Sequence, residues 1–70
     1  MKSFPKLRGR IVEKYGSQKL FAKALHKSPQ TVINKLGGVS EFSKNDIVEW
    51  SLALDIDKDM VGDYFFTSEL

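Results

Sequence analysis

Cysteine is absent from the sequence, and so is any long apolar run. Without cysteine, neither a disulfide nor a thiolate metal site supports so short a chain, and its stability must come from packed helices. No apolar stretch approaches the ~20 residues that a membrane span needs, and the start MKSFPKLRGR lacks the apolar segment of a signal peptide. These absences favour a cytoplasmic protein with a single domain, residues 1–70.

Acidic residues are almost missing from the first half of the chain. Residues 1–35 hold nine lysines and arginines and a single acid, Glu13, which gives a net charge of +8. Residues 36–70 hold two lysines and eight acids, which gives a net charge of −6. Such polarity predicts one face for a polyanion and another for solvent or a protein partner, with ordinary solvated charge as the simpler alternative.

Apolar residues recur at helical spacing along the chain, and no repeat, low-complexity tract or linker interrupts them. Serines stand where three helices should begin, at Ser17, Ser28 and Ser43, and Gly16 and Gly37 follow predicted helix ends. The expected helices cover about residues 5–15, 17–25, 29–36, 43–54 and 59–65.

The apolar stripes of these helices predict the core. Leu20 is expected to pack on the first helix, and the segment 65–67 is compatible with either a helical or an extended end. Phe66 and Leu70 are expected to be exposed and to offer a dimer surface. The predicted core comprises Phe4, Leu7, Ile11, Val12, Tyr15, Phe21, Ala22, Leu25, Val32, Leu36, Ile47, Trp50, Leu54, Met60, Val61, Tyr64 and Phe65.

Two of the expected helices, 17–25 and 29–36, are joined only by a tight turn around His26. So short a turn fixes a steep crossing angle, and Ala22 is small where the helices cross. This geometry lets the second helix protrude into a DNA major groove. The sequence therefore predicts a helix-turn-helix over about residues 17–36.

The spacing of Gln18, Ala22, Leu25 and Val32 resembles the helix-turn-helix of the lambda-repressor-like domains, the Cro and CI regulators of temperate phages. A closer similarity, to the short Cro-like regulators of Gram-positive phages, covers nearly the whole chain. It rests on TVINKLG at 31–37, on Phe42-Ser43 with Ile47, and on YFF at 64–66. The resemblance implies an all-α fold, a five-helix lambda-repressor-like DNA-binding domain.

The resemblance also implies a transcriptional repressor that binds double-stranded operator DNA sequence-specifically. A homodimer on a pseudo-palindromic operator is expected, because one recognition helix reads only a few base pairs. Two residues depart from the family pattern. His26 stands where the family usually has glycine in the turn, and Pro29 is uncommon at the tip of the recognition helix.

Carried over residue by residue, the resemblance implies two sets of DNA contacts. The amides of Gln30 and Asn34 lie on one helix face and can pair with adenine N6 and N7, which predicts an A·T-biased half-site. The implied base contacts are Ser28, Pro29, Gln30 and Asn34. The implied phosphate contacts are Gln18, Lys19, Lys27, Thr31, Lys35 and Lys44. Plain solvation is the alternative for each lysine and for Gln30 and Asn34, and support of the first helical turn is the alternative for Thr31.

Nothing in the sequence suggests catalysis, a cofactor or a small-molecule substrate. His26 has no neighbouring ligand set, and the run 55–59 lacks the central glycine and distal glutamate of a calcium loop, so no metal site is predicted. Trp50, Tyr64 and Phe65 are expected in the core rather than stacked on a ligand. A protein-interaction module of the same fold, such as an antirepressor that does not bind DNA, is the alternative function.

Overall fold

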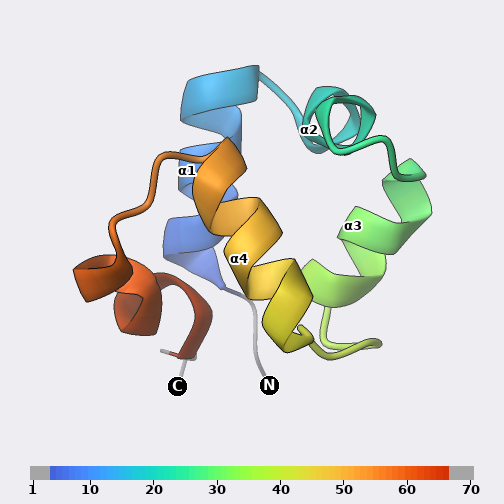
Figure 1. The fold of residues 1–70 in the computed structure, drawn as a ribbon. Helices are drawn as coiled ribbons and strands as arrows, with labels where there is room; N and C mark the ends of the chain where they lie inside the picture. Colours follow the sequence, from blue (N-terminus) through green and yellow to red (C-terminus); the bar gives the residue numbers. More distant parts are fainter. Residues whose placement is uncertain (1–3, 67–70) are drawn as a thin grey trace.

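The computed structural model describes residues 4–66, in which four α-helices precede a 3₁₀ turn and a π-helical turn (Figure 1). The described residues contain no strand, so the predicted all-α fold class is confirmed. The expected fifth helix is divided between the last two elements, and residues 67–70, including Thr67 and Leu70, lie outside the described range. The elements are α1 (Pro5–Tyr15), α2 (Gln18–Ala24), α3 (Pro29–Leu36), α4 (Lys44–Ala53), η1 (Lys58–Met60) and η2 (Gly62–Phe66).

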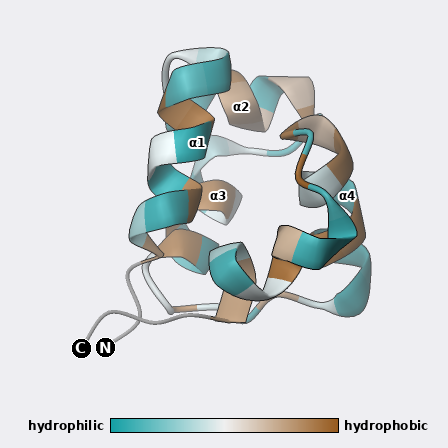
Figure 2. Cartoon of the chain, turned by 90° about the vertical axis from the view of Figure 1, so that its left-hand side faces the viewer, coloured by the Kyte–Doolittle hydropathy of each residue, from teal (hydrophilic) through white to brown (hydrophobic). Residues whose placement is uncertain are grey.

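Helices α2 and α3 lie on one side of the molecule and η1 and η2 on the opposite side, with α1 and α4 between them (Figure 1). The four α-helices surround a common interior, and hydrophilic and hydrophobic bands alternate along α1, as an amphipathic helix requires (Figure 2). Within residues 4–66, no helix is both long and apolar enough to cross a bilayer.

Serine begins three of the helices, as predicted. The Oγ of Ser17 accepts from the Leu20 N–H at 3.1 Å, and the Oγ of Ser28 accepts from the Thr31 N–H at 3.3 Å. At Ser43 the Oγ accepts from the Asp46 N–H at 3.1 Å, while the Asp46 carboxylate accepts from the Ser43 N–H at 2.8 Å. This reciprocal capping box fixes the start of α4, and each cap satisfies a backbone donor that the helix itself leaves unpaired.

Three helices end in the same way, with a left-handed residue directly after the C-cap. His26 (φ 60°) follows α2, Gly38 (φ 82°) follows α3 and Asp55 (φ 53°) follows α4. In each case the next N–H reaches back to a carbonyl of the last turn, for example from Lys27 to Ala22 at 2.9 Å. These are Schellman motifs, which turn the chain sharply out of the helix. His26 therefore adopts a left-handed conformation that glycine adopts without strain.

Polar side chains of α1 hold the ends of two other helices. The Arg8 guanidinium donates to the Leu36 carbonyl at the end of α3 at 2.9 Å. The Arg10 guanidinium donates to the Leu54 carbonyl at the end of α4 at 2.8 Å, and the Tyr15 hydroxyl donates to the Ala53 carbonyl at 2.7 Å. Cationic donors at a helix C-terminus satisfy free carbonyls and oppose the negative end of the helix dipole.

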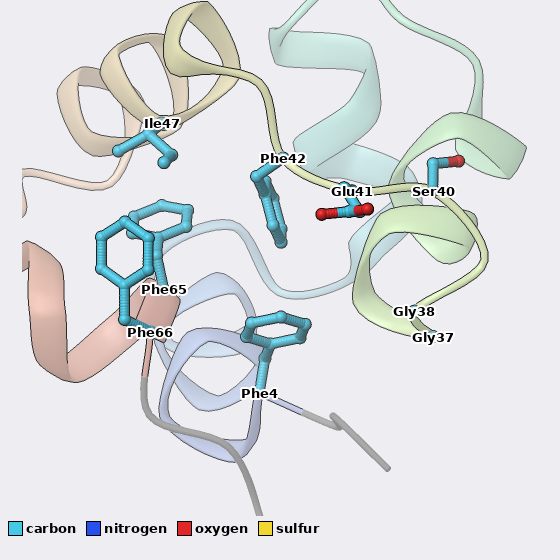
Figure 3. A pocket seen from close by; sticks show the side chains of 9 residues that line it. All are labelled: Phe4, Gly37, Gly38, Ser40, Glu41, Phe42, Ile47, Phe65 and Phe66. Atoms are coloured by element: carbon cyan, nitrogen blue, oxygen red, sulfur yellow. The ribbon is translucent and has the colours of Figure 1, made fainter.

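Phe42, in the loop before α4, is the centre of an aromatic cluster (Figure 3). Its ring meets Phe4, Trp50 and Phe65 edge to face, at centroid separations of 5.3, 4.8 and 5.1 Å. Trp50 in turn meets Phe21 of α2 at 4.9 Å. Edge-to-face pairs contribute stability beyond the area that they bury, so this chain of rings joins α2, α4, η2 and the residue that precedes α1.

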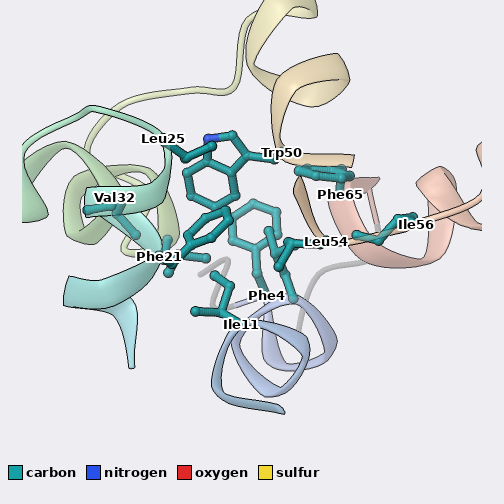
Figure 4. Packing of buried hydrophobic residues seen from close by; sticks show 12 residues of the cluster. Phe4, Ile11, Phe21, Leu25, Val32, Trp50, Leu54, Ile56 and Phe65 are labelled. Atoms are coloured by element: carbon teal, nitrogen blue, oxygen red, sulfur yellow. The ribbon is translucent and has the colours of Figure 1, made fainter. Parts of the chain in front are cut away.

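The remaining core packs around these rings (Figure 4) and confirms most of the predicted members. Two predictions were wrong, because periodicity identifies a helix face but not whether a neighbour covers its edge. Val12 is 54% exposed and Met60 is 40% exposed. Leu20 is half exposed, with its side chain near Gly16 at the end of α1. Conversely, Ile56 is buried without having been predicted, since the turn at Asp55 folds the chain back.

Replacing His26 with glycine should stabilise the fold. A left-handed backbone costs a non-glycine residue roughly 1–2 kcal/mol, and the greater freedom of glycine in the unfolded chain cancels part of the gain. We expect a net gain of roughly 0.5–1 kcal/mol, measured by urea unfolding followed by circular dichroism. As a control, Ala24→Gly within α2 should lower stability by about 1 kcal/mol at most. A His26→Gly protein that unfolds at lower urea than wild type would contradict the inferred strain.

Candidate nucleic-acid interface

Helices α2 and α3 lie where the helix-turn-helix is predicted, and only residues 25–28 separate them. The apolar residues that hold the two helices together are all buried, namely Phe21, Ala22, Leu25, Val32 and Leu36. The buried faces point inward, so α3 keeps its opposite face at the edge of the molecule, at the right of Figure 1. A helix held in this way can enter a groove along most of its length.

Gln30 and Asn34 meet each other on the outer face of α3. Gln30 is exposed and Asn34 is partly exposed, and the Gln30 Nε2 donates to the Asn34 Oδ1 at 2.8 Å. The bond fixes the two amides relative to each other. It leaves the Gln30 Oε1 as an acceptor and the Asn34 Nδ2 as a donor, the two functions that adenine N6 and N7 require in the major groove.

The hydroxyls at the start of α3 are engaged with each other. Ser28 and Pro29 are exposed, and Thr31 is partly buried. The Ser28 Oγ, which caps the helix, lies 3.0 Å from the Thr31 Oγ1. A base contact by Ser28 would have to share its hydroxyl with the cap, and the contacts assigned to these three residues stay predictions.

Three basic residues of α1 make internal contacts instead of extending into solvent. Arg8 and Arg10 hold the carbonyls described above, and Lys14 pairs with the Asp55 carboxylate. The Lys14 ammonium lowers the pKa of Asp55 below its usual value. The high formal charge of this half is therefore smaller at the surface than the sequence suggests, because part of it joins α1 to the ends of α3 and α4.

The lysines on and beside the helix-turn-helix are exposed. Lys19 and Lys23 lie on α2, Lys27 lies in the turn and Lys44 begins α4. Within residues 4–66, the structure pairs none of these four ammonium groups with a carboxylate. Gln18, the first residue of α2, is partly exposed. The surface around α3 thus offers cations of the kind that contact phosphates, and Lys23, which was not predicted, is among them.

Lys35 has a structural contact. Its ammonium lies 2.7 Å from the Asp46 carboxylate and donates to the Glu41 carbonyl at 3.1 Å, and its side chain is only 15% exposed. Lys35 therefore fastens the end of α3 to the first turn of α4. Burial raises the pKa of Asp46, but hydrogen bonds from Lys35 and Ser43 outweigh it and hold that pKa below the usual 3.8. The phosphate contact assigned to Lys35 stays a prediction.

Comparison with protein families gives a match over residues 2–68, to the family described as "Protein of unknown function (DUF739)". The chain belongs to the DUF739 family. No curated protein matches it. Among solved structures it is similar to the solution structure of the modulator of repression (MOR) of the temperate bacteriophage TP901-1 from Lactococcus lactis. The two chains are 29% identical with a TM-score of 0.85, over 99% of this chain and 93% of the other.

This similarity to a temperate-phage regulatory protein agrees with the kind of protein that the sequence resembles. The name of that protein is neither Cro nor CI, so the Cro-like assignment of this DUF739 chain stays a prediction. The high TM-score over nearly both whole chains shows that they share the same helical fold.

A pocket of about 550 Å³ lies beyond the C-terminal end of α3, between the 37–42 loop and η2 (Figure 3). Aromatic rings form much of its wall, and of its nine lining residues only Glu41 has a titratable side chain. Phe66, at its rim, is 69% exposed, as predicted. Across residues 4–66, no three His, Cys, Asp or Glu side chains gather as metal ligands would.

The Lys35–Asp46 pair should make the stability of this DUF739 protein sensitive to acid. The folded state lowers the Asp46 pKa, so its contribution is complete above pH 3.8 and is lost as the pH falls through the lower folded value. Asp46→Asn should therefore be less stable than wild type at pH 7, with a gap that narrows below about pH 4. Urea unfolding between pH 2 and pH 7 measures the gap.

Lys35→Met tests the other member of the ion pair in the same series. Without the Lys35 ammonium the pKa of Asp46 should be lowered less, so the free energy of unfolding should depend less on pH in the acid range. Parallel stability curves for Asp46→Asn and wild type down to pH 2 would contradict the assigned pKa direction.

Proposed function

We propose that this DUF739 protein is a phage regulator that binds double-stranded operator DNA by inserting α3 into the major groove. The observation that carries the proposal is the Gln30–Asn34 amide pair, joined at 2.8 Å on the outer face of a helix that buried residues hold from behind. Exposed lysines at 19, 23, 27 and 44 supply cations for the phosphates on either side. The protein acts by occupancy, as a Cro-like repressor in the host cytoplasm, with no catalytic step or cofactor.

We further propose that it binds as a homodimer. A single α3 exposes about two turns of helix and reads only a few base pairs, so one copy would bind DNA weakly and recognise only a short sequence. Two copies related by a twofold axis would place their α3 helices about one DNA turn apart, roughly 34 Å, on a pseudo-palindromic site. Doubling the contacts in this way raises both affinity and specificity.

A second candidate function is binding to a protein instead of DNA. The observation in its favour is the name of the similar structure, a modulator of repression, which describes an effect on repression. The acidic second half of the chain also suits a basic protein surface. In this case the acidic second half would bind the partner, and the chain alone would have little affinity for a duplex.

A mobility-shift titration at several salt concentrations separates the two functions. DNA binding through phosphates requires affinity to fall steeply with salt, with a log–log slope of about −0.9 for each phosphate contacted. Lys27→Ala should reduce the slope by about one unit and weaken binding to all sequences alike. Lys58→Ala, an exposed lysine in η1 on the far side of the molecule, should leave the slope unchanged. Equal salt slopes for the two variants would show that the turn between α2 and α3 does not contact DNA phosphates.

Gln30→Ala should weaken binding to a selected operator by about 1–3 kcal/mol and relax the preference at one base pair of each half-site. Selection of bound sequences from a random DNA pool, with wild type and variant in parallel, measures both effects. Asn45→Ala, an exposed amide on α4, provides the control. A Gln30→Ala protein that selects the same sequences with full affinity would mean that the Gln30–Asn34 pair does not read bases.

A further inference from the structure

Ile33 is an apolar side chain in an unusual place. It lies in the middle of α3, where Val32 and Leu36 are fully buried, yet 47% of its own surface is exposed. Of the large hydrophobic residues that are exposed, it is the one on α3. The core does not account for Ile33, because its neighbour Val32 already occupies the inward face of this turn.

Ile33 belongs to an apolar stripe that runs along the amide pair. Pro29, Ile33 and Gly37 are spaced four residues apart and therefore share one line on the helix, next to the line of Gln30 and Asn34. Pro29 and Gly37 are both exposed. The outer surface of α3 thus consists of two parallel lines, one of amides and one of apolar groups.

Glycine at position 37 keeps the end of this stripe open. Its φ of −88° is one that any residue can adopt, so the backbone does not require glycine there. A Cβ at this position would lie 3.2 Å from the Ile33 carbonyl oxygen, a tight contact. A side chain at 37 would both crowd this carbonyl and project beside the stripe. Its absence lets a flat partner approach Ile33 closely.

We propose that Ile33 reads thymine, by packing its side chain against the C5-methyl group in the major groove. This inference rests on the proposed function. It adds the residue that recognises thymine, the partner of the adenine that the two amides contact. The major-groove edge of an A·T pair presents adenine N7 and N6, then thymine O4, then the thymine C5-methyl, so a line of amides and a parallel line of apolar atoms match its polar and apolar ends. The Gln30–Asn34 pair recognises adenine, and Ile33 recognises the thymine of the same or the next pair.

The deciding experiment removes one methyl group from the DNA. Each thymine of the selected operator is replaced in turn by deoxyuridine, which differs only in lacking the C5-methyl. Wild-type protein should lose affinity about fourfold at one thymine per half-site, the effect of one buried methyl-sized group. Ile33→Ala should bind the thymine operator more weakly than wild type and show no further loss at that deoxyuridine.

Two further variants make the result unambiguous. Ile33→Val keeps part of the contact and should respond to the same deoxyuridine by an intermediate factor. Val48→Ala, which shortens an exposed side chain of α4, should respond as wild type does. Because Ile33 is half exposed, thermal unfolding of its variants should stay close to wild type, which separates a lost contact from a lost fold.

The outcomes distinguish this inference from the proposed function. Sequence-specific binding in which no deoxyuridine matters, or in which Ile33→Ala responds as strongly as wild type, would overturn the role of Ile33 and leave DNA binding intact. Failure of wild type to bind any selected sequence would overturn both proposals. A loss confined to one thymine in wild type and absent from Ile33→Ala would establish the contact.

Discussion

The packing of aromatic rings around Phe42 is the constraint on which the rest of the structure depends. A chain this short has room for one small core, and a single loop residue brings Phe4, Trp50 and Phe65 into contact. Through Trp50 the cluster reaches Phe21 of α2, and α2 in turn carries α3. The orientation of the exposed helix therefore follows from rings buried on the other side of the core.

Local features of the fold could be predicted from the sequence because their causes are local. A serine hydroxyl can cap a helix three residues on, and a left-handed residue can close one, whatever surrounds them. The exposure of Val12 and Met60 could not be predicted, since it depends on which elements cover a helix edge. Ile56 escaped prediction for the same reason, being covered by a turn that periodicity does not describe.

In the candidate site, too, local features could be predicted from the sequence and contacts between elements could not. The spacing of Gln30 and Asn34 is enough to put both on one face of α3, and the structure adds that they bond to each other. The interaction partners of Arg8, Arg10 and Lys35 could not be predicted from the sequence, because each partner lies on another element. Counting charges therefore overstated the basic surface. The exposure of Ile33 could not be predicted either, because an apolar residue in a helix is expected to be buried.

The opposite placement of the helix-turn-helix and of η1 and η2 gives the molecule an electric dipole. The exposed Lys19, Lys23 and Lys27 lie at one end, while Asp57, Asp59 and Asp63 outnumber a single exposed lysine, Lys58, at the other. In the field of a polyanion such as the proposed operator DNA, this molecule would experience a torque as well as an attraction. Its negative end would then point away from the DNA and would repel a second layer of bound protein.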